Sequence, residues 1–204
     1  MSYICKVNFY EAVKKRRMRR HFVDTEISTD VVRRIVWAIS KAPSAGHTQG
    51  NRILVLHSSH SRDRFWSCCE SEEWPSRQPP SLRFASLIIV FFENQDAYID
   101  RYQQQDKEGV LKRNKGQFVA PYWTIDAAFM AMIGQLSAVE EGLDYLFFGV
   151  HQDLDRLFDE FEISKKLRVI GVLAIGRSID VASGSALRRE KLSPDQISIG
   201  GKVH

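Results

Sequence analysis

The sequence predicts one α+β domain, in which short apolar strands alternate irregularly with amphipathic helices. Its 204 residues are 44% hydrophobic and 26% charged, which is the composition of a folded globular domain with a single core. The uninterrupted apolar run at residues 87–92 has the length of a buried strand, and no apolar run in the chain is long enough to cross a bilayer. These observations exclude disordered, collagen-like, coiled-coil and integral membrane proteins.

Two helices are expected before the first strand. Asn8 can cap the first, which ends in a basic run, and the second begins near Ser28 and ends before Pro43. Residues 42–50 are expected to form a loop of small residues, and residues 53–56 the first strand. The apolar positions that define the two helices are Phe9, Ala12, Val13, Val32, Ile35, Val36 and Ile39.

The second half of the chain is organised around a central strand at residues 87–92. The polar residues 94–120 are expected to form an excursion from the core, such as a mobile lid. A long, deeply buried helix is expected from Pro121 to Gly142, and the tail after Arg177 is expected to protrude and to pack on a partner subunit. The apolar positions of the long helix are Ile125, Phe129, Met132, Ile133, Leu136 and Val139. The remaining elements are a strand at 145–148, a helix at 154–161 and a strand at 169–175.

Positive charge is concentrated in one segment. The chain has 29 basic and 25 acidic residues, a net charge of +4, and residues 14–20 alone contain Lys14, Lys15, Arg16, Arg17, Arg19 and Arg20. Three interpretations of this run are open: a solvated helix end, a patch that binds nucleic acid or another polyanion, and a clamp for one phosphate group. The N-terminus lacks the pattern of a secretory signal, and two of the three cysteines are adjacent, so we expect a cytoplasmic protein without a disulfide framework.

Motifs for several kinds of catalysis are missing from the sequence. It contains no GxGxxG, GxxxxGK[ST], HExxH or GxSxG pattern, so nucleotide cradles, zincins and hydrolase triads lack their signatures. His57, His60, Cys68 and Cys69 could together supply four zinc ligands. We expect no metal there, because adjacent cysteines do not easily bind one tetrahedral ion and His57 is expected to be an exposed loop histidine.

Several segments, taken in order, resemble the nitroreductase family of flavin enzymes. FYEAVKKRRMRRHF, a helix, APSAGHTQG, a long helix ending in EEGLDYLFFGV, the strand RVIGVLAIG and the tail RREKL follow one another as in that family. Each motif alone is weak, but together they span nearly the whole chain. The resemblance implies a central, mostly antiparallel sheet flanked by helices, and a homodimer with an exchanged C-terminal tail.

The resemblance also implies an FMN site at the dimer interface. Residues that would contact the ribityl phosphate are Arg16, Arg17, Met18, Arg20 and the tail residue Arg189, with Met18 replacing the usual serine and contributing backbone. Residues that would pass the flavin ring from the partner subunit are Pro43, Ser44, Ala45, Gly46 and Gln49. Gly50 and Asn51 stand where proline and tryptophan are common, a change expected to leave room near the ring.

The implied chemistry resides in the flavin rather than in a catalytic side chain. The backbone of Phe148, Gly149 and Val150 would face flavin N5, which would pass hydride from NAD(P)H to a nitroaromatic, quinone or similar small acceptor in a ping-pong reaction. Tyr122 and Trp123, with Tyr98 and Tyr102, are expected to form the wall that faces the substrate. Alternatives within the superfamily are a reductive dehalogenase-like or a flavin-fragmenting reaction. A nucleic-acid or polyanion-binding module that uses residues 14–20 is the alternative of another class, although we expect neither a nucleic-acid nor a membrane partner.

Overall fold

Four antiparallel strands form the centre of the molecule. The computed structural model describes residues 8–69, 79–107, 109, 118–150, 154–179 and 190–199. The strands are β1 (Arg52–Leu56), β2 (Leu87–Glu93), β3 (Asp144–Phe148) and β4 (Arg168–Gly176), in the order β1-β2-β4-β3. Every residue of β2 is buried, and this strand pairs with β1 on one side and β4 on the other, so the prediction of a central strand at residues 87–92 is confirmed.

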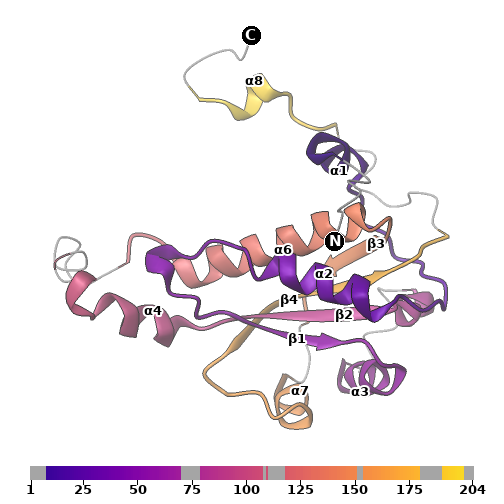
Figure 1. Cartoon of the computed structure of the whole chain (residues 1–204), viewed down its shortest axis with the longest axis horizontal. Helices are drawn as coiled ribbons and strands as arrows, with labels where there is room; N and C mark the ends of the chain where they lie inside the picture. The colour runs from indigo at the N-terminus through magenta and orange to yellow at the C-terminus, as the bar shows by residue number, and fades with distance from the viewer. Residues whose placement is uncertain are drawn as a thin grey trace.

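Helices cover both faces of this sheet (Figure 1). Helices α2 (Thr29–Ile39) and α6 (Tyr122–Glu140) lie on one face, and α3 (Ser59–Cys69) and α7 (Leu154–Glu160) on the other. Alternate residues of β2 serve the two cores, because successive side chains of a strand point to opposite faces. Ile88, Val90 and Phe92 pack in the core with α3 and α7. Leu87, Ile89 and Phe91 pack in the core with α2 and α6.

The first two helices begin where their capping residues predict. In α1 (Phe9–Lys15) the Asn8 side chain accepts a hydrogen bond from the Glu11 N–H, and in α2 the Ser28 side chain accepts one from Val31. Helix α2 ends at Ile39, a few residues before Pro43. The expected apolar face of α1 is largely exposed, however, because only Ala12 is buried while Phe9 and Val13 lie at the surface.

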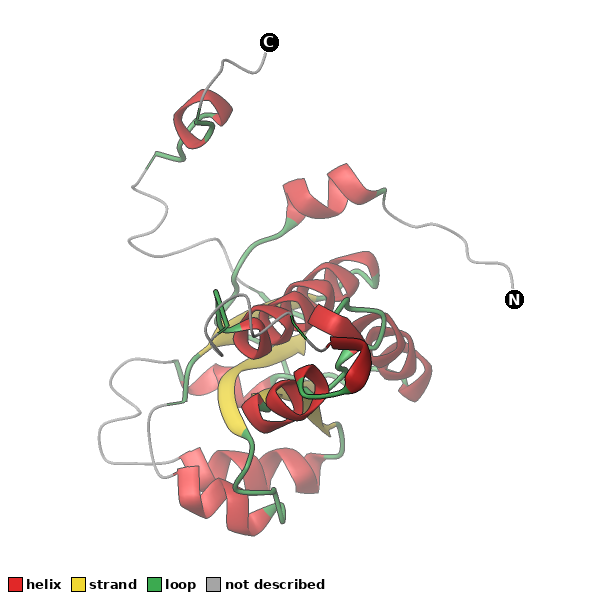
Figure 2. Cartoon of the chain, turned by 90° about the vertical axis from the view of Figure 1, so that its left-hand side faces the viewer, coloured by secondary structure: helices red, strands yellow, loops and turns green. Residues whose placement is uncertain are grey.

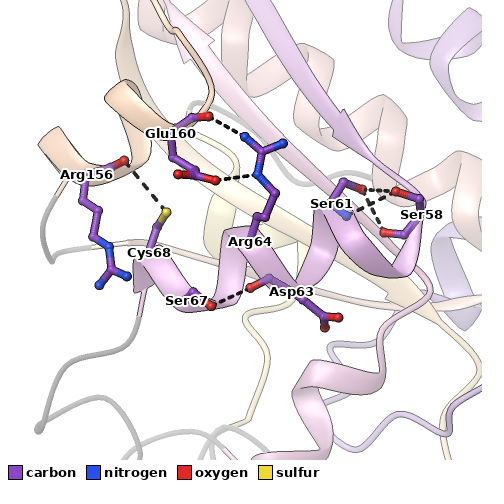
Figure 3. A network of polar contacts seen from close by, with 8 residues as sticks. All are labelled: Ser58, Ser61, Asp63, Arg64, Ser67, Cys68, Arg156 and Glu160. Atoms are coloured by element: carbon purple, nitrogen blue, oxygen red, sulfur yellow. Dashed lines mark hydrogen bonds and ion pairs between the residues drawn. The ribbon is translucent and has the colours of Figure 1, made fainter.

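Helix α3 is an element that the sequence patterns did not indicate. It buries Phe65, Trp66, Cys68 and Cys69 beneath the sheet. Figure 3 shows how it is joined to α7: the Arg64 guanidinium pairs with the Glu160 carboxylate and donates to the Glu160 carbonyl, and the Cys68 thiol lies 3.8 Å from the carbonyl of Arg156. These bonds fix α3 and α7 side by side.

The long helix α6 is deeply buried on one face only. Its large apolar residues Phe129 and Met132 are 45% and 44% exposed. Small residues face the sheet instead, and a Cβ added to Gly134 would lie 3.1 Å from both Ile39 and Leu173. The close approach of α6 to the sheet and to α2 leaves no space for large side chains on that face. The predicted deep burial therefore holds for the face of small residues, whereas Phe129 and Met132 lie outside it. The residues that α6 does bury are Asp126, Ala127, Ala131, Gly134, Gln135 and Ala138.

Short elements complete the chain. They are η1 (Ala45–His47), η3 (Pro80–Phe84), α4 (Gln95–Tyr102), η4 (Gln105–Lys107) and α8 (Pro194–Ile197). In the expected excursion at 94–120, Tyr98 of α4 is fully buried, so this helix is anchored in the core. Helix α8 stands away from the layered body, as Figure 2 also shows. Among the helices that the structure describes, none is both long and apolar enough to span a bilayer.

Candidate functional site

The basic run lies beside the edge strand β3. Met18 forms a parallel bridge with Tyr145, and the Arg19 N–H donates to the Tyr145 carbonyl at 2.8 Å. The Arg16 guanidinium lies 3.4 Å from the Tyr145 hydroxyl. Burial raises the pKa of Tyr145, and the neighbouring Arg16 offsets part of that rise. We name residues 16–20 the basic arm. The backbone contacts of Met18 and Arg19 hold this arm along β3.

The arginines of the basic arm have different surroundings. Arg17 donates from Nη1 to the carbonyls of Lys14 and Arg16, at 2.9 and 2.8 Å, so it caps the C-terminal end of α1. Arg19 Nε lies 3.8 Å from the Asp144 carboxylate. Arg16 and Arg20 are both half-buried. Of the three arginines that the sequence groups as phosphate contacts, Arg16 and Arg20 are thus half-buried and Arg17 is exposed.

Met18 contributes its side chain as well as its backbone. Its thioether sulfur accepts the Phe147 N–H at 3.3 Å, a contact to the strand edge that a serine side chain at this position is too short to reproduce. Met18 thereby strengthens the attachment of the basic arm to β3, in a position where the family resemblance implies a hydroxyl contact.

Residues 43–49, which we name the ring loop, have an unusual backbone. Gly46, His47 and Gln49 all adopt positive φ, at 62°, 55° and 50°. Such a conformation is costly for residues other than glycine and is often found at functional sites. Two hydrogen bonds hold it: the Gln49 N–H donates to Ser44 Oγ at 3.0 Å, and Thr48 Oγ1 donates to the Ala45 carbonyl at 2.6 Å. Pro43 at the start of the ring loop is exposed.

A buried carboxylate joins the ring loop to two helices. Asp126 of α6 is only 4% exposed, and its Oδ2 accepts both the Ala45 N–H and the Tyr98 hydroxyl, each at 2.7 Å. No motif or spacing in the sequence predicts a role for Asp126. A signal was present, because Asp126 is the only charged residue between Pro121 and Val139 and is followed directly by seven apolar residues.

The space expected near Gly50 and Asn51 is filled. A Cβ added to Gly50 would lie 2.6 Å from the Cβ of Ala97, because α4 packs directly against the loop there. Asn51 is buried, donates to the Trp123 carbonyl at 2.9 Å and accepts the Asn94 N–H at 3.3 Å. The expectation of free room at these positions is therefore wrong: glycine allows the close approach of α4, and the Asn51 amide ties that helix to the start of α6.

An aromatic cluster borders the ring loop. It consists of Tyr102, Phe118, Tyr122 and Trp123, with the Phe118 ring centroid 5.1, 6.2 and 5.5 Å from those of the other three. A Cβ added to Gly46 would meet the Tyr102 ring at 2.9 Å, so the cluster directly contacts the ring loop. The structure thus places the expected wall residues Tyr122 and Trp123 in one cluster with Tyr102, which contacts the ring loop. Tyr98 cannot face a substrate, because its side chain is 0% exposed.

The segment expected to face flavin N5 follows β3. The Phe148 ring stacks on Trp66 in the core, with centroids 6.3 Å apart and planes at 7°, and Val150 is also buried. Gly149 between them is exposed. Only backbone at Gly149 is therefore available to a ligand from this segment. The expected phosphate residue Arg189 lies outside the described residues.

The basic arm and the ring loop lie at opposite ends of α6 in one chain (Figure 1). Asp126 holds the ring loop near the start of the helix, whereas the basic arm pairs with Tyr145, just beyond its end. At 1.5 Å per residue the helix advances roughly 20 Å between these points. A single chain therefore keeps the two groups of expected FMN contacts apart.

The four residues that could form a zinc site are differently engaged. His57 follows β1 in a loop, as expected, but it is half-buried rather than exposed, with Nε2 2.8 Å from the Ile27 carbonyl. Burial, with the neighbouring Cys68, raises the pKa of Cys69 to about 12, which disfavours the thiolate that binds zinc. No group of three or more potential ligands that could hold a metal occurs among the described residues.

Several known proteins are similar to this chain in sequence or in structure. The chain is 23% identical over 197 residues to an "NADPH-dependent oxidoreductase" of Staphylococcus aureus strain bovine RF122 / ET3-1, covering 96% of this chain and 74% of that protein. A nitroreductase in complex with FMN from Exiguobacterium sibiricum 255-15 superposes with a TM-score of 0.70 at 20% identity, covering 96% and 98% of the two chains. The nitroreductase CinD of Lactococcus lactis, in complex with 4-nitrophenol, gives a TM-score of 0.76 at 17% identity, with coverage of 96% and 100%.

The two structural neighbours show that the fold is shared, with the antiparallel sheet flanked by helices that the sequence predicts. The model of the Nitroreductase family matches residues 13–177, a span that begins in α1, includes the basic arm and the ring loop, and ends just after β4. This chain therefore belongs to the nitroreductase family.

Proposed function

We propose that two copies of this chain bind FMN at their interface and catalyse the oxidation of NAD(P)H by a small organic acceptor. The observation that carries this proposal is the separation of the basic arm from the ring loop within one chain. A site that uses both groups needs the basic arm of one protomer and the ring loop of its partner. The NADPH-dependent relative and the FMN complex of a structural neighbour support the choice of cofactor and reductant.

The residues present fit the chemical groups of FMN. Half-buried Arg16 and Arg20 offer guanidinium groups, which bind a phosphomonoester through paired hydrogen bonds. The ring loop offers small residues and a glycine with φ of 62°, which let the backbone approach a flat ring closely. The exposed backbone at Gly149 provides a further polar contact. When bound, FMN supplies the redox chemistry, and the chain binds, orients and shields it.

Exposed apolar residues support the dimer. Phe9 and Tyr10 on α1 and Phe129 and Met132 on α6 lie at the surface of the single chain, and α1 contacts α6. A partner that covers these side chains would remove a substantial apolar area from water. The tail residues Leu192, Ile197 and Ile199 are exposed as well, which favours a tail that packs on the partner subunit.

The proposal predicts a yellow protein. We expect the purified dimer to show a flavin spectrum, to release FMN on denaturation, and to lose its absorbance near 450 nm when NADPH is added without oxygen. Continued NADPH consumption with a quinone or a nitroaromatic would distinguish this reaction from the dehalogenase-like and flavin-fragmenting alternatives. A colourless protein that takes up no added FMN would overturn the proposal.

A further inference from the structure

Helix α4 is attached to the ring loop by hydrogen bonds as well as by packing. Its Tyr98 hydroxyl shares the carboxylate oxygen of Asp126 with the Ala45 N–H. Its Arg101 Nε donates to the Gly46 carbonyl at 2.9 Å. Its Tyr102 ring lies against the Gly46 backbone. On the loop side, these three contacts converge on two adjacent residues, Ala45 and Gly46.

The contact that joins α4 to the ring loop is a buried carboxylate, Asp126, whose two hydrogen-bond donors are uncharged. Asp126 is 4% exposed, and both hydrogen bonds end on the same oxygen, Oδ2. Burying a carboxylate is costly unless it is hydrogen-bonded, so loss of either donor would leave Asp126 poorly satisfied. This cost couples the two partners: the ring loop cannot leave Asp126 without weakening the position of α4.

Arg101 is itself held in place for its contact with the ring loop. Its two Nη atoms donate to the Asp106 carboxylate, each at 2.7 Å, and Nη1 also donates to Gln104 Oε1 at 2.9 Å. The Arg101 hydrogen bonds hold the pKa of Asp106 below its ordinary value, so the carboxylate stays charged. A guanidinium fixed in this way loses little further freedom when Nε binds the Gly46 carbonyl.

We propose that Asp126 is the positioning residue of the ring loop, and that α4 clamps that loop in its left-handed conformation through Asp126 and Arg101. Resting on the proposed function, this assigns α4 a role in the affinity for the flavin ring. The ring loop and α4 then form one unit, so that opening one requires breaking the hydrogen bonds of the other. Asp126 contacts no substrate in this scheme and acts through Ala45.

Two substitutions at Asp126 separate a hydrogen-bonding role from a charge role. Asp126→Ala removes the acceptor, whereas Asp126→Asn keeps one oxygen that can accept both donors. A matched control is Gln135→Ala, since Gln135 is also a buried polar residue of α6 but lies more than two turns from the ring loop. Each variant is measured in two ways: amide hydrogen exchange of residues 44–49 in the flavin-free protein, and the dissociation constant for FMN by fluorescence titration.

Asp126→Ala should speed exchange in the ring loop and weaken FMN binding, each by about tenfold or more, the loss expected for one hydrogen bond to a charged group. Asp126→Asn should stay within about threefold of the wild type, and Gln135→Ala should change neither quantity. Equal effects of Asp126→Ala and Gln135→Ala would overturn the proposal, as would failure of Asp126→Asn to restore both quantities.

Tyr98→Phe keeps the test decisive if Asp126→Ala does not fold. This variant removes only the α4 donor, and it should speed exchange in residues 95–102 together with the ring loop. Faster exchange in α4 alone would show that the two do not move as one unit. If wild-type protein binds no FMN, the proposed function fails, yet the exchange measurements still decide whether Asp126 and α4 hold the ring loop.

Discussion

The Tyr102 ring lies so close to Gly46 that a Cβ on that glycine would be 2.9 Å from ring atom Cε2. Gly46 also has a φ of 62°, which L side chains rarely adopt. Gly46→Ala should therefore lower the free energy of unfolding through two effects. Backbone strain should cost about 1–2 kcal/mol, and overpacking against the Tyr102 ring about 1–3 kcal/mol. Chemical denaturation with and without FMN measures the change.

Gly142 provides the matched control for Gly46. Its φ of 70° is similar, but a Cβ there would meet nothing within 4 Å. Gly142→Ala should therefore cost only the backbone contribution, about 1–2 kcal/mol. If the two alanine variants lose the same stability, the contact with Tyr102 is not what constrains Gly46.

Arg16 and Arg20 should dominate binding of the FMN phosphate. Each substitution to alanine should raise the FMN dissociation constant about 10- to 100-fold, because a hydrogen bond to a charged group is worth roughly 1.5–3 kcal/mol. Arg17→Ala should have a smaller effect on FMN and should instead destabilise α1, since Arg17 donates to the carbonyls at the end of that helix.

The control for these variants is Arg33→Ala, which removes an exposed arginine of α2 that pairs with Asp30. Its FMN affinity should equal that of the wild type at every salt concentration. Retention of tight FMN binding by an Arg16→Ala, Arg20→Ala double variant would exclude the basic arm as the phosphate site.

The fold was largely predictable because its signals are local. Asn8 and Ser28 cap helices where the sequence places them, and residues 87–92 are uniformly apolar, as a strand covered on both faces must be. The burial of α6 was not predictable from periodicity. Periodicity identifies a face rich in large apolar residues, but it does not show whether that face meets the sheet or a partner. The outcome depends on how closely α6 approaches the sheet, and Gly134 and its alanine neighbours set that distance.

The candidate site was only partly predictable because its connections are long-range. The ring loop and the wall residues Tyr122 and Trp123 could be named from motifs, but their meeting depends on α4, which the sequence presents only as a polar excursion. Asp126 joins segments that are 81 and 28 residues away in sequence. No local pattern specifies such partners, although a carboxylate beside a run of apolar helix residues is a reason to search for them.

Tyr98 should make stability sensitive to alkaline pH. Burial and the hydrogen bond to Asp126 raise its pKa above the ordinary value of 10.0. As the pH rises, the unfolded chain therefore loses the Tyr98 proton before the folded protein does. The stabilisation that protonated Tyr98 gives the folded protein is fully present below pH 10 and is lost as the pH rises above it. Above pH 10 the free energy of unfolding should fall by up to about 1.4 kcal/mol per pH unit from this group.

Tyr98→Phe isolates that contribution. The variant should be about 1–2 kcal/mol less stable at pH 7, because Asp126 loses a donor, and its stability should decline less steeply between pH 10 and 11. Burial also raises the pKa values of Tyr102 and Tyr145, but both residues are present in both proteins, so their contributions cancel in the difference. Parallel stability curves for the two proteins would contradict this role of Tyr98.

Phe129 and Met132 should hold the proposed dimer together. They are the large apolar residues of α6 that the chain itself leaves 45% and 44% exposed. Replacing both with glutamate would place charges where an apolar partner surface is expected, and burying unpaired charges is costly. We expect the double variant to sediment as a monomer and to lose FMN, because in the proposed site each flavin needs the ring loop of one protomer and the basic arm of the other.

Trp37 supplies the control for this last experiment. It is also a large exposed apolar residue, on α2, where Lys41 lies 5.3 Å from its ring centroid. Trp37→Glu should leave both the sedimentation coefficient and the bound FMN unchanged. A Phe129→Glu, Met132→Glu variant that becomes monomeric but keeps its flavin would show that one chain suffices to bind FMN, which would contradict a site shared between protomers even though the dimer itself was correctly located.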